Sequence, residues 1–347
     1  VNLRNIDLCS CGDGNILEYA DGKVMVSAFP LVHDVDNCGY HLHIDGEKAI
    51  YATDKNGKTR KLSTRPGTHN ATFAVGMKYY MNVYSSADTP PVTTLHDAGG
   101  KTLATLIDNK ELTTKLQGKL GQKEFFTFTT SEGVQLNGWM VKPQDFDPAR
   151  KYPVVMYQYS GPGSQQVLDS WYAGNMTGTL YEQYLGQRGF ISVVVDGRGT
   201  GGRGREFEQC TYLKLGQLES HDQVEAAIYL GSLPYVDKNR MGVHGWSFGG
   251  FMTTNLMLTF PEVFKVGVAG GPVIDWNYYE VMYGERYMDT PQQNPEGYKN
   301  SNLRLRAGNL KGRLQLIIGY NDPVCVPQHT LSFIRACIDA GTQCDYF

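Results

Sequence analysis

Hydrophobic and polar residues follow one pattern in the first third of the chain and another in the rest. Up to residue 118, short runs rich in apolar and β-branched residues, such as 23–28 and 80–84, are separated by Asp-Gly and Asn-Gly pairs. These pairs suit hairpin turns that need a positive φ, and one hairpin is predicted from strand 48–53 and turn 54–58. The first 118 residues are therefore predicted to be antiparallel β-structure. Strands at this spacing are typical of β-propeller blades, but they are too few to close a ring.

The pattern changes across residues 112–121, and we place a domain boundary between 118 and 119. A hairpin with strands at 124–130 and 134–141 comes next, followed by strands and helices in alternation. Strands are predicted at 154–159, 190–196, 240–244, 265–269, 314–319 and from 344, and helices at 181–188, 221–233, 250–260 and 327–340. This alternation indicates an α/β domain built on a largely parallel sheet.

Length and composition agree with this organisation. The 347 residues are enough for about two domains, and 41% hydrophobic residues allow a sizeable core. The formal charge of −3 gives no electrostatic reason to expect nucleic acid or an anionic membrane surface as a partner. No apolar run approaches the ~18 residues of a membrane-spanning helix. The chain begins at Val1 without an initiator Met or a signal-peptide pattern, which suggests a processed product or an excised fragment.

The cysteine and histidine residues form no recognisable metal-binding motif. The seven cysteines include no zinc-type CxxC pair, and their odd number leaves at least one free thiol or missing partner. His41 and His43 would share one face of a strand, but no third ligand accompanies them, so a structural role is favoured. Cys9 and Cys11 are interpreted in the same way. Neither a metal nor an organic cofactor is expected.

The candidate chemistry centres on the pentapeptide Gly-Trp-Ser-Phe-Gly at 245–249, which has the G-x-S-x-G pattern. In a nucleophile elbow the serine occupies a sharp turn between a strand and a helix, and small residues are needed on both sides. A predicted strand precedes Ser247 and a predicted helix follows it. Ser247 is therefore predicted to be a nucleophile at the carboxyl end of a strand in an α/β-hydrolase sheet. The alternative is an ordinary Gly-Ser loop.

Longer motifs extend this interpretation. They are YQYSGP at 157–162, DGRG at 196–199, GWSFGG at 245–250 and WNYYEVMYGERYM at 276–288. With these motifs, residues 120–347 resemble the dipeptidyl peptidase IV branch of the prolyl oligopeptidase family of serine peptidases. The resemblance implies an α/β-hydrolase peptidase domain at 119–347, incomplete at its C-terminal end. It also implies that residues 1–118 are the last part of an incomplete β-propeller, although the first 40 residues match only weakly.

The resemblance and the chain order of α/β-hydrolases, Ser then Asp then His, imply a catalytic triad. Asp322, in the loop after the predicted strand 314–319, is the predicted acid. The resemblance places the histidine after the strand that begins at 344, beyond the last residue, Phe347. We interpret His329 as a surface or capping residue rather than a substitute, and His244 as structural.

Further site residues follow from the resemblance. The backbone N–H of Phe248 and the hydroxyl of Tyr159 are the predicted oxyanion donors. A pocket for the residue before the scissile bond is implied, shaped as an aromatic box for a pyrrolidine ring. By spacing alone, its aromatic residues would be assigned to ordinary core. Its predicted residues are Val273, Trp276, Tyr279 and Tyr283. Val324 stands where the family has an asparagine that holds the substrate backbone, so affinity or selectivity is expected to differ.

The predicted function is that of a serine exopeptidase that releases Xaa-Pro or Xaa-Ala dipeptides through an acyl-serine at Ser247. The expected substrates are peptides with a free N-terminus. The family's glutamates that hold this amino group belong to a propeller segment that the sequence lacks. The alternatives are an acylaminoacyl-peptidase or oligopeptidase of the same superfamily, and a catalytically silent binding protein on this fold. The resemblance is compatible with a homodimer through the hydrolase domain, and it alone favours a periplasmic, cell-surface or secreted location.

Overall fold

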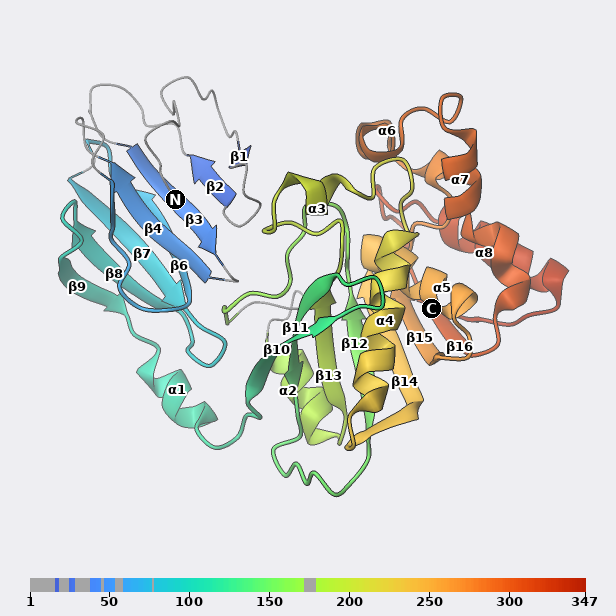
Figure 1. Cartoon of the computed structure of the whole chain (residues 1–347), viewed down its shortest axis with the longest axis horizontal. Helices are drawn as coiled ribbons and strands as arrows, with labels where there is room; N and C mark the ends of the chain where they lie inside the picture. Colours follow the sequence, from blue (N-terminus) through green and yellow to red (C-terminus); the bar gives the residue numbers. More distant parts are fainter. Residues whose placement is uncertain are drawn as a thin grey trace. The chain divides into compact units, whose positions relative to one another are not determined.

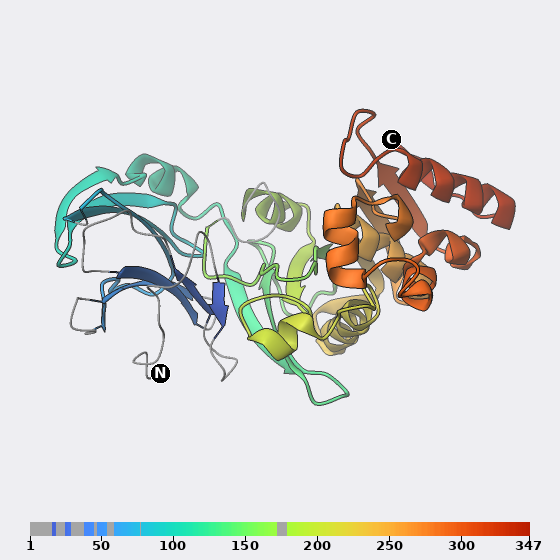
Figure 2. The ribbon, with the colours of Figure 1, turned by 90° about the horizontal axis from the view of Figure 1, so that it is seen from above.

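The strands that the structure describes form two sheets, which are shown in Figures 1 and 2. The computed structural model describes residues 16–18, 25–28, 38–44, 47–53, 59–76, 78–171 and 179–347. The chain divides into two units. The first comprises residues 1–120 with the segments 168–173 and 202–206, and the second comprises 121–167, 174–201 and 207–347. Segments 168–173 and 202–206 belong to the first unit although they follow the predicted boundary at 118/119, so one boundary in the sequence does not separate the two units.

The first unit contains a nine-stranded sheet. Its strands are β1 (Ile16–Glu18), β2 (Met25–Ala28), β3 (Cys38–Ile44), β4 (Glu47–Thr53), β5 (Thr59–Lys61), β6 (Thr68–Phe73), β7 (Tyr79–Ser85), β8 (Val92–Asp97) and β9 (Thr102–Ile107). All described pairs are antiparallel except the single parallel pair Lys48↔Thr68 between β4 and β6. The predicted antiparallel β-structure is confirmed. The propeller stays a prediction, and turn 54–58 lies outside the described residues.

The second unit contains an eight-stranded sheet in the order β10-β11-β13-β12-β14-β15-β16-β17. Its strands are β10 (Lys123–Thr129), β11 (Gln135–Val141), β12 (Tyr152–Gln158), β13 (Ile191–Asp196), β14 (Val236–Trp246), β15 (Phe264–Gly270), β16 (Arg313–Ile317) and β17 (Asp345–Tyr346). β10 and β11 form the predicted hairpin, β11 runs antiparallel to β13, and the pairs from β12 to β17 are parallel. This mixed sheet is that of an α/β-hydrolase, so the predicted fold of this part is confirmed.

In the described structure, helices occupy every connection from β12 to β17 and the connection between β9 and β10. They are α1 (Lys110–Leu116), α2 (Thr179–Gln187), α3 (Arg205–Gln209), α4 (Leu218–Ser232), α5 (Phe248–Thr259), α6 (Val281–Met288), α7 (Pro295–Ser301) and α8 (Gln328–Ala340), with the 3-10 helices η3 (Trp276–Tyr278) and η4 (Leu303–Asn309). The predicted helices at 181–188, 221–233, 250–260 and 327–340 correspond to α2, α4, α5 and α8. Within the described residues, no helix combines the length and apolarity needed to cross a bilayer.

Side chains along β12 alternate between two hydrophobic clusters. Val154 and Met156 belong to the main core, which also takes in buried residues of α4 and α5. Tyr157, the residue after Met156, packs instead against a smaller cluster that includes Trp139 and Val194. A strand covered on both faces has no polar side, and all six residues of the neighbouring β13 are buried. Figure 1 shows α4 in front of this sheet. The buried layers hold the carboxyl ends of the parallel strands in fixed positions.

Candidate active site

Ser247 occupies the sharp turn between β14 and α5. Its φ of 59° and ψ of −117° lie outside the regions that L-residues normally adopt. The Ser247 N–H donates to the carbonyl oxygen of Gly270 (2.9 Å), and the Ser247 carbonyl accepts from the N–H of Phe251 (3.0 Å). Strand β15 and the first turn of α5 therefore hold the strained residue between them. This is the strand-turn-helix geometry of a nucleophile elbow.

Gly245 and Gly249 are required by close packing of the backbone. A Cβ atom on Gly245 would lie 2.1 Å from the carbonyl oxygen of Gln158, and one on Gly249 would lie 2.0 Å from the same oxygen. Real Cβ atoms essentially never approach another atom to within 3.0 Å. Because neither glycine has a positive φ, close approach rather than backbone conformation explains both.

The hydroxyl of Ser247 has two neighbours in the site. The thiol of Cys325 donates to Ser247 Oγ over 3.8 Å, and the side chain of Tyr279 hydrogen-bonds to Ser247 as well. Burial raises the pKa of the Cys325 thiol to about 11 and the pKa of Tyr279 to about 12. Both groups are therefore neutral near pH 7. They orient the serine hydroxyl but do not remove its proton.

Asp322, the predicted acid, lies in the loop after β16 and is half-buried. Its Oδ1 accepts the backbone N–H groups of Val324 and Cys325, each at 2.9 Å. These two hydrogen bonds hold the loop in the conformation in which the Cys325 thiol contacts Ser247. The Gly271 N–H donates to the carbonyl of the last residue of β16 (2.7 Å), which holds the ends of β15 and β16 together. Ser247 and Asp322 thus lie at the same edge of the sheet.

His329 is not a surface residue, and that part of the sequence interpretation is wrong. It is fully buried in the first turns of α8, with 0% of its surface exposed. Its Nδ1 accepts the N–H groups of Ile274 (3.0 Å) and Asp275 (3.4 Å). Both bonds require an unprotonated Nδ1, and burial lowers the pKa of His329 to about 4. His329 is therefore a neutral anchor for the segment before η3.

His244 is engaged away from the serine. Its ring lies between the rings of Tyr157 and Tyr181, with a centroid distance of 5.4 Å to each. Burial lowers the pKa of His244 to about 4. Tyr157 packs on the sheet face opposite the main core, so this histidine is directed to that face. The contacts agree with the structural role predicted for it.

Trp276, Tyr279 and Tyr283 lie together, although they do not share one helix. Trp276 is in η3, Tyr279 follows it, and Tyr283 is in α6. The Trp276 ring stacks on Tyr283 (centroids 5.9 Å apart) and meets Tyr279 edge-on (5.3 Å). Trp276 and Val273 are 2% and 1% exposed, whereas both tyrosines are half-buried. The tyrosines form the accessible wall, and Trp276 and Val273 support it from behind.

The two predicted oxyanion donors come from neighbouring strand ends. Tyr159 follows β12 directly, and its ring centroid lies 6.3 Å from that of Phe248, at the start of α5. Burial raises the pKa of Tyr159, and the nearby Cys325 and Tyr287 raise it further. Its hydroxyl therefore keeps its proton and can donate a hydrogen bond. The Phe248 ring is buried against Trp276 (5.7 Å), which fixes the backbone next to Ser247.

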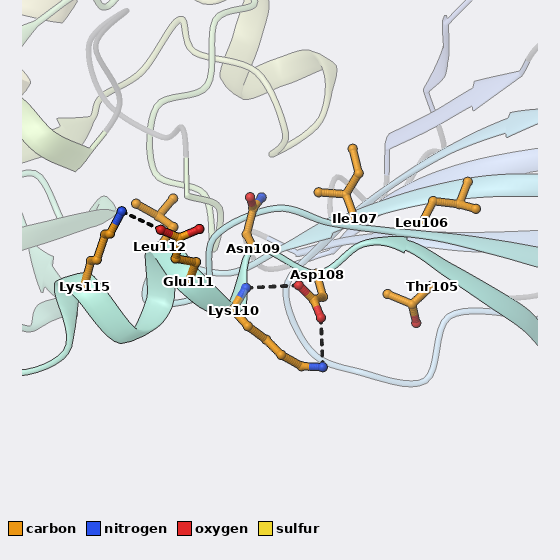
Figure 3. A pocket seen from close by; sticks show the side chains of 9 residues that line it. All are labelled: Thr105, Leu106, Ile107, Asp108, Asn109, Lys110, Glu111, Leu112 and Lys115. Carbon is orange, nitrogen blue, oxygen red and sulfur yellow. Dashed lines mark hydrogen bonds and ion pairs between the residues drawn. The ribbon is translucent and has the colours of Figure 1, made fainter.

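A hollow of about 590 Å³ lies in the first unit. Residues 105–112 and Lys115 line it (Figure 3). Lys110 pairs with Asp108 (2.8 Å) and Lys115 with Glu111 (2.6 Å), so charges in the hollow neutralise one another. In the described part of the chain, no three His, Cys, Asp or Glu side chains are grouped as a metal site. Cys9 and Cys11, and the side chains of the two β3 histidines, lie outside it.

Known proteins share this architecture and sequence. The model of the prolyl oligopeptidase family matches residues 178–347. A probable dipeptidyl-aminopeptidase B from Aspergillus oryzae is 33% identical over 306 residues, covering 85% of this chain and 32% of that protein. A probable dipeptidyl peptidase 4 from Aspergillus flavus is 34% identical over 277 residues, covering 79% of this chain and 36% of that protein. The chain thus spans about a third of the length of the curated relatives it matches.

Solved structures agree along almost the whole chain. The crystal structure of Porphyromonas gingivalis dipeptidyl peptidase 4 matches with a TM-score of 0.86 and 36% identity, covering 97% of this chain and 53% of that one. This chain belongs to the dipeptidyl peptidase IV branch of the prolyl oligopeptidase family. A putative dipeptidyl aminopeptidase IV from Bacteroides ovatus, another similar structure, gives a TM-score of 0.75 at 34% identity, covering 96% of this chain and 60% of that one.

In this prolyl oligopeptidase family member, two residues near Ser247 were not predicted from the sequence. Cys325 reaches the serine only because the Asp322 loop turns back toward α5. Tyr287 lies one helical turn after Tyr283 in α6, and their rings meet at 4.8 Å. That spacing was a usable signal for Tyr287, because residues four apart share a helix face. No local pattern indicated the contact of Cys325.

Proposed function

We propose that the protein to which this chain belongs is a serine-type dipeptidyl peptidase, which removes dipeptides from peptides whose second residue is proline or alanine. The strained Ser247 elbow carries the proposal, because such a turn presents a serine hydroxyl at the sheet edge where Asp322 also lies. The names of the similar proteins, dipeptidyl-aminopeptidase and dipeptidyl peptidase, support the same reaction class.

In the proposed reaction, Ser247 Oγ attacks the carbonyl carbon of the substrate's second residue, and the bond to the nitrogen of the third residue breaks. Its proton passes to a histidine, which the family resemblance assigns to sequence after β17, and Asp322 orients that histidine. The negative charge on the tetrahedral oxygen is stabilised by the Phe248 N–H and the Tyr159 hydroxyl. The histidine then protonates the leaving amine, and water hydrolyses the acyl-serine by the same steps. The proposed reaction uses no metal or organic cofactor.

Specificity is assigned to the tyrosine wall. Tyr279 and Tyr283 meet edge-on, with ring centroids 5.4 Å apart, and stand on the buried Trp276. Flat rings supported from behind suit a compact pyrrolidine ring and leave little room for a large side chain. Val324, two residues after Asp322 and 48% exposed, has no side-chain amide to offer a substrate backbone. We therefore assign selectivity to this wall rather than to hydrogen bonds from the acid loop.

The nucleophile is tested by labelling the full-length protein with a fluorophosphonate, which reacts with activated serines. Labelling is expected at Ser247 and is expected to disappear in Ser247→Ala. Ser232→Ala, which changes an exposed serine at the end of α4, is the matched control and should label like the parent. Full labelling of Ser247→Ala would exclude Ser247 as the nucleophile.

Specificity is tested with chromogenic Gly-Pro and Gly-Phe substrates and with N-acetylated versions of both. The proposal expects Gly-Pro to be cleaved with at least about tenfold higher kcat/KM than Gly-Phe, because one misfitting group in a pocket typically costs this much or more. The acetylated substrates should be inert. Faster cleavage of acetylated than of free substrates would instead indicate an acylaminoacyl-peptidase.

A further inference from the structure

Cys337 and Cys344 bring two thiols together at the C-terminal end of α8. Cys337, near the end of the helix, is 1% exposed and belongs to the main hydrophobic core. Cys344, which directly precedes β17, is half-buried and packs against the same core. Both carry free thiols, and the two side chains hydrogen-bond to each other. The helix and the following strand thus direct both cysteines into one contact.

The turn between the two cysteines is fixed by its own hydrogen bonds. Gly341 ends α8 in the left-handed conformation (φ 72°), and the Thr342 N–H donates back to the carbonyl of Cys337 (2.9 Å). The Thr342 hydroxyl also donates to the carbonyl of Ala307 (3.0 Å). After this turn the chain enters β17, which pairs parallel with β16. The approach of Cys344 to Cys337 is therefore held by backbone structure on both sides.

The two thiols differ in acidity and in access. The hydrogen bond from Cys344 lowers the pKa of Cys337, against the effect of burial, and the same bond raises the pKa of Cys344. Cys337 is therefore the better thiolate but is shielded from solvent. Cys344 is the more accessible sulfur. Access therefore sets the order despite the acidity: only the Cys344 sulfur can meet an external disulfide, and the shielded Cys337 thiolate then resolves the mixed disulfide.

We propose that Cys337 and Cys344 form a redox pair, which closes to an intramolecular disulfide across the C-terminal cap of α8 when a small disulfide such as oxidised glutathione is present. Cys344 loses its proton and attacks one sulfur of the small disulfide, which releases one thiol. The Cys337 thiolate then attacks the Cys344 sulfur and releases the second thiol. Two electrons pass to the small disulfide, its S–S bond is replaced by the Cys337–Cys344 bond, and the two thiol protons end on the released thiols.

The closed ring ties the end of α8 to the start of β17. A covalent link across a short loop stabilises a protein mainly by restricting its unfolded chain. The oxidised protein is therefore expected to melt several degrees above the reduced protein. The bond lies at the opposite end of α8 from the Asp322 loop, so oxidation is expected to leave the site around Ser247 unchanged.

The full-length protein is incubated with oxidised glutathione or with dithiothreitol, alkylated without reduction, and digested. Trypsin leaves both cysteines in one peptide beginning at Ala336, because no Lys or Arg lies between them. This peptide should lose the mass of two hydrogen atoms and escape alkylation. Cleavage of the backbone before Asp339 places the two cysteines in different fragments. In the oxidised protein the disulfide should hold these fragments together until a reductant is added. The rise in Tm should be reversed by the reductant.

Two variants complete the test. Cys344→Ser should abolish the joined fragments and the oxidant-dependent rise in Tm. Cys210→Ser, which removes another half-buried thiol, should retain both. Full alkylation of Cys337 and Cys344 after oxidation, or a stable glutathione adduct on Cys344 without ring closure, would overturn the proposal. So would an oxidant-dependent rise in Tm that persists in Cys344→Ser.

Discussion

Strands β9 and β13 are both rich in apolar residues but have opposite surroundings. All six residues of β9 (TLATLI) are exposed, whereas all six residues of β13 (ISVVVD) are buried. Among the described strands, β9 pairs only with β8, while β13 lies between β11 and β12 in a sheet packed on both faces. An apolar run thus predicts a strand, but the position of the strand in its sheet decides how much free energy burial contributes.

The same contrast separates the two units. The second unit contains the strained Ser247 and a fully buried carboxyl group, Glu219. The helical ion pairs described in the first unit, such as Lys115–Glu111, are exposed and contribute little to stability. Backbone strain and a buried carboxyl group persist only where surrounding packing is strong enough to hold them. The comparison teaches that the buried sheet is the part of this chain suited to hold a reactive site.

The largest expected effect is that of Ser247→Ala, which tests whether the second unit carries the reactive site. If the chemistry depends on the second unit's elbow, Ser247→Ala should lower kcat of the full-length protein on a Gly-Pro chromogenic substrate by about 10⁵–10⁶. The loss follows because the variant has no nucleophile, while binding and the oxyanion donors remain. The Ser232→Ala control should keep full activity. Comparable rates in both variants would move the reaction away from the elbow.

A second prediction separates two tyrosines of the site. Tyr159→Phe should lower kcat by about 10²–10³, because one hydrogen bond made mainly in the transition state is lost. KM should change little. Tyr279→Phe removes a hydrogen bond to the resting Ser247 hydroxyl and should cost only about tenfold. Steady-state kinetics of both variants decide the assignment. Reversal of the two magnitudes would make Tyr279, rather than Tyr159, the oxyanion donor.

The third prediction concerns the buried carboxyl group of Glu219. Glu219 is 0% exposed, its Oε2 accepts the N–H of Gly216 (2.9 Å), and burial raises its pKa to about 8. The folded protein therefore binds this proton more tightly than the unfolded chain, whose carboxyl has the ordinary pKa of 4.5. The contribution of Glu219 to stability is complete below pH 4.5, decreases as pH rises toward 8, and is constant above that.

Glu219→Gln should remove this pH-dependent loss, because the amide oxygen still accepts the Gly216 hydrogen bond without carrying a charge. Relative to the parent, its Tm should be higher at pH 9 than at pH 5 by several degrees. Glu111→Gln, at an exposed position of the first unit, should show the parent's pH dependence. A parallel shift of Glu219→Gln at both pH values would show that this carboxyl does not titrate as its burial implies.

The smallest expected effect is on stability, and it compares the same substitution, Ile to Val, in the buried strand β13 and the exposed strand β9. Ile191 in β13 is 0% exposed, and Ile107 in β9 is 54% exposed. Ile191→Val removes a buried methyl group and should lower the free energy of unfolding by about 0.5–1.5 kcal/mol. Ile107→Val should change it by less than about 0.5 kcal/mol. Denaturant unfolding followed by far-UV circular dichroism measures both. Equal losses would show that β9 is covered in the protein in solution.

Much of the fold could be predicted from the sequence because its signals are local. The turn chemistry of Asp-Gly pairs marked the hairpins, and the change from alternating to helical spacing separated the two parts. Glycines at 245 and 249 identified the elbow, since only a crowded turn requires both. Asp322 was found by its position after a strand together with the family resemblance. Each of these features depends on neighbours close in sequence.

The features that were missed depend on the path of the chain in space. His329 was assigned to the surface, yet it is buried because its acceptor nitrogen meets the backbone of residues 274 and 275. By spacing alone, Trp276 and Tyr283 would be assigned to ordinary core, but a break between η3 and α6 brings their rings into a stack. Cys325 touches Ser247 only through the folding of the Asp322 loop. The spacing of residues along the sequence does not predict contacts of this kind between distant segments.

The carbonyl oxygen of Gln158 restricts how this sequence can vary over evolutionary time. It faces both elbow glycines, so the smallest side chain at either position would collide with the same atom. Relief would require β12 to move, and Tyr159, attached directly to Gln158, would move with it. A lineage could not exchange one glycine, repair the clash and keep the proposed oxyanion donor in successive viable steps. Saturation mutagenesis under selection for activity should therefore return glycine alone at positions 245 and 249, with substitutions at one never rescued by changes at the other.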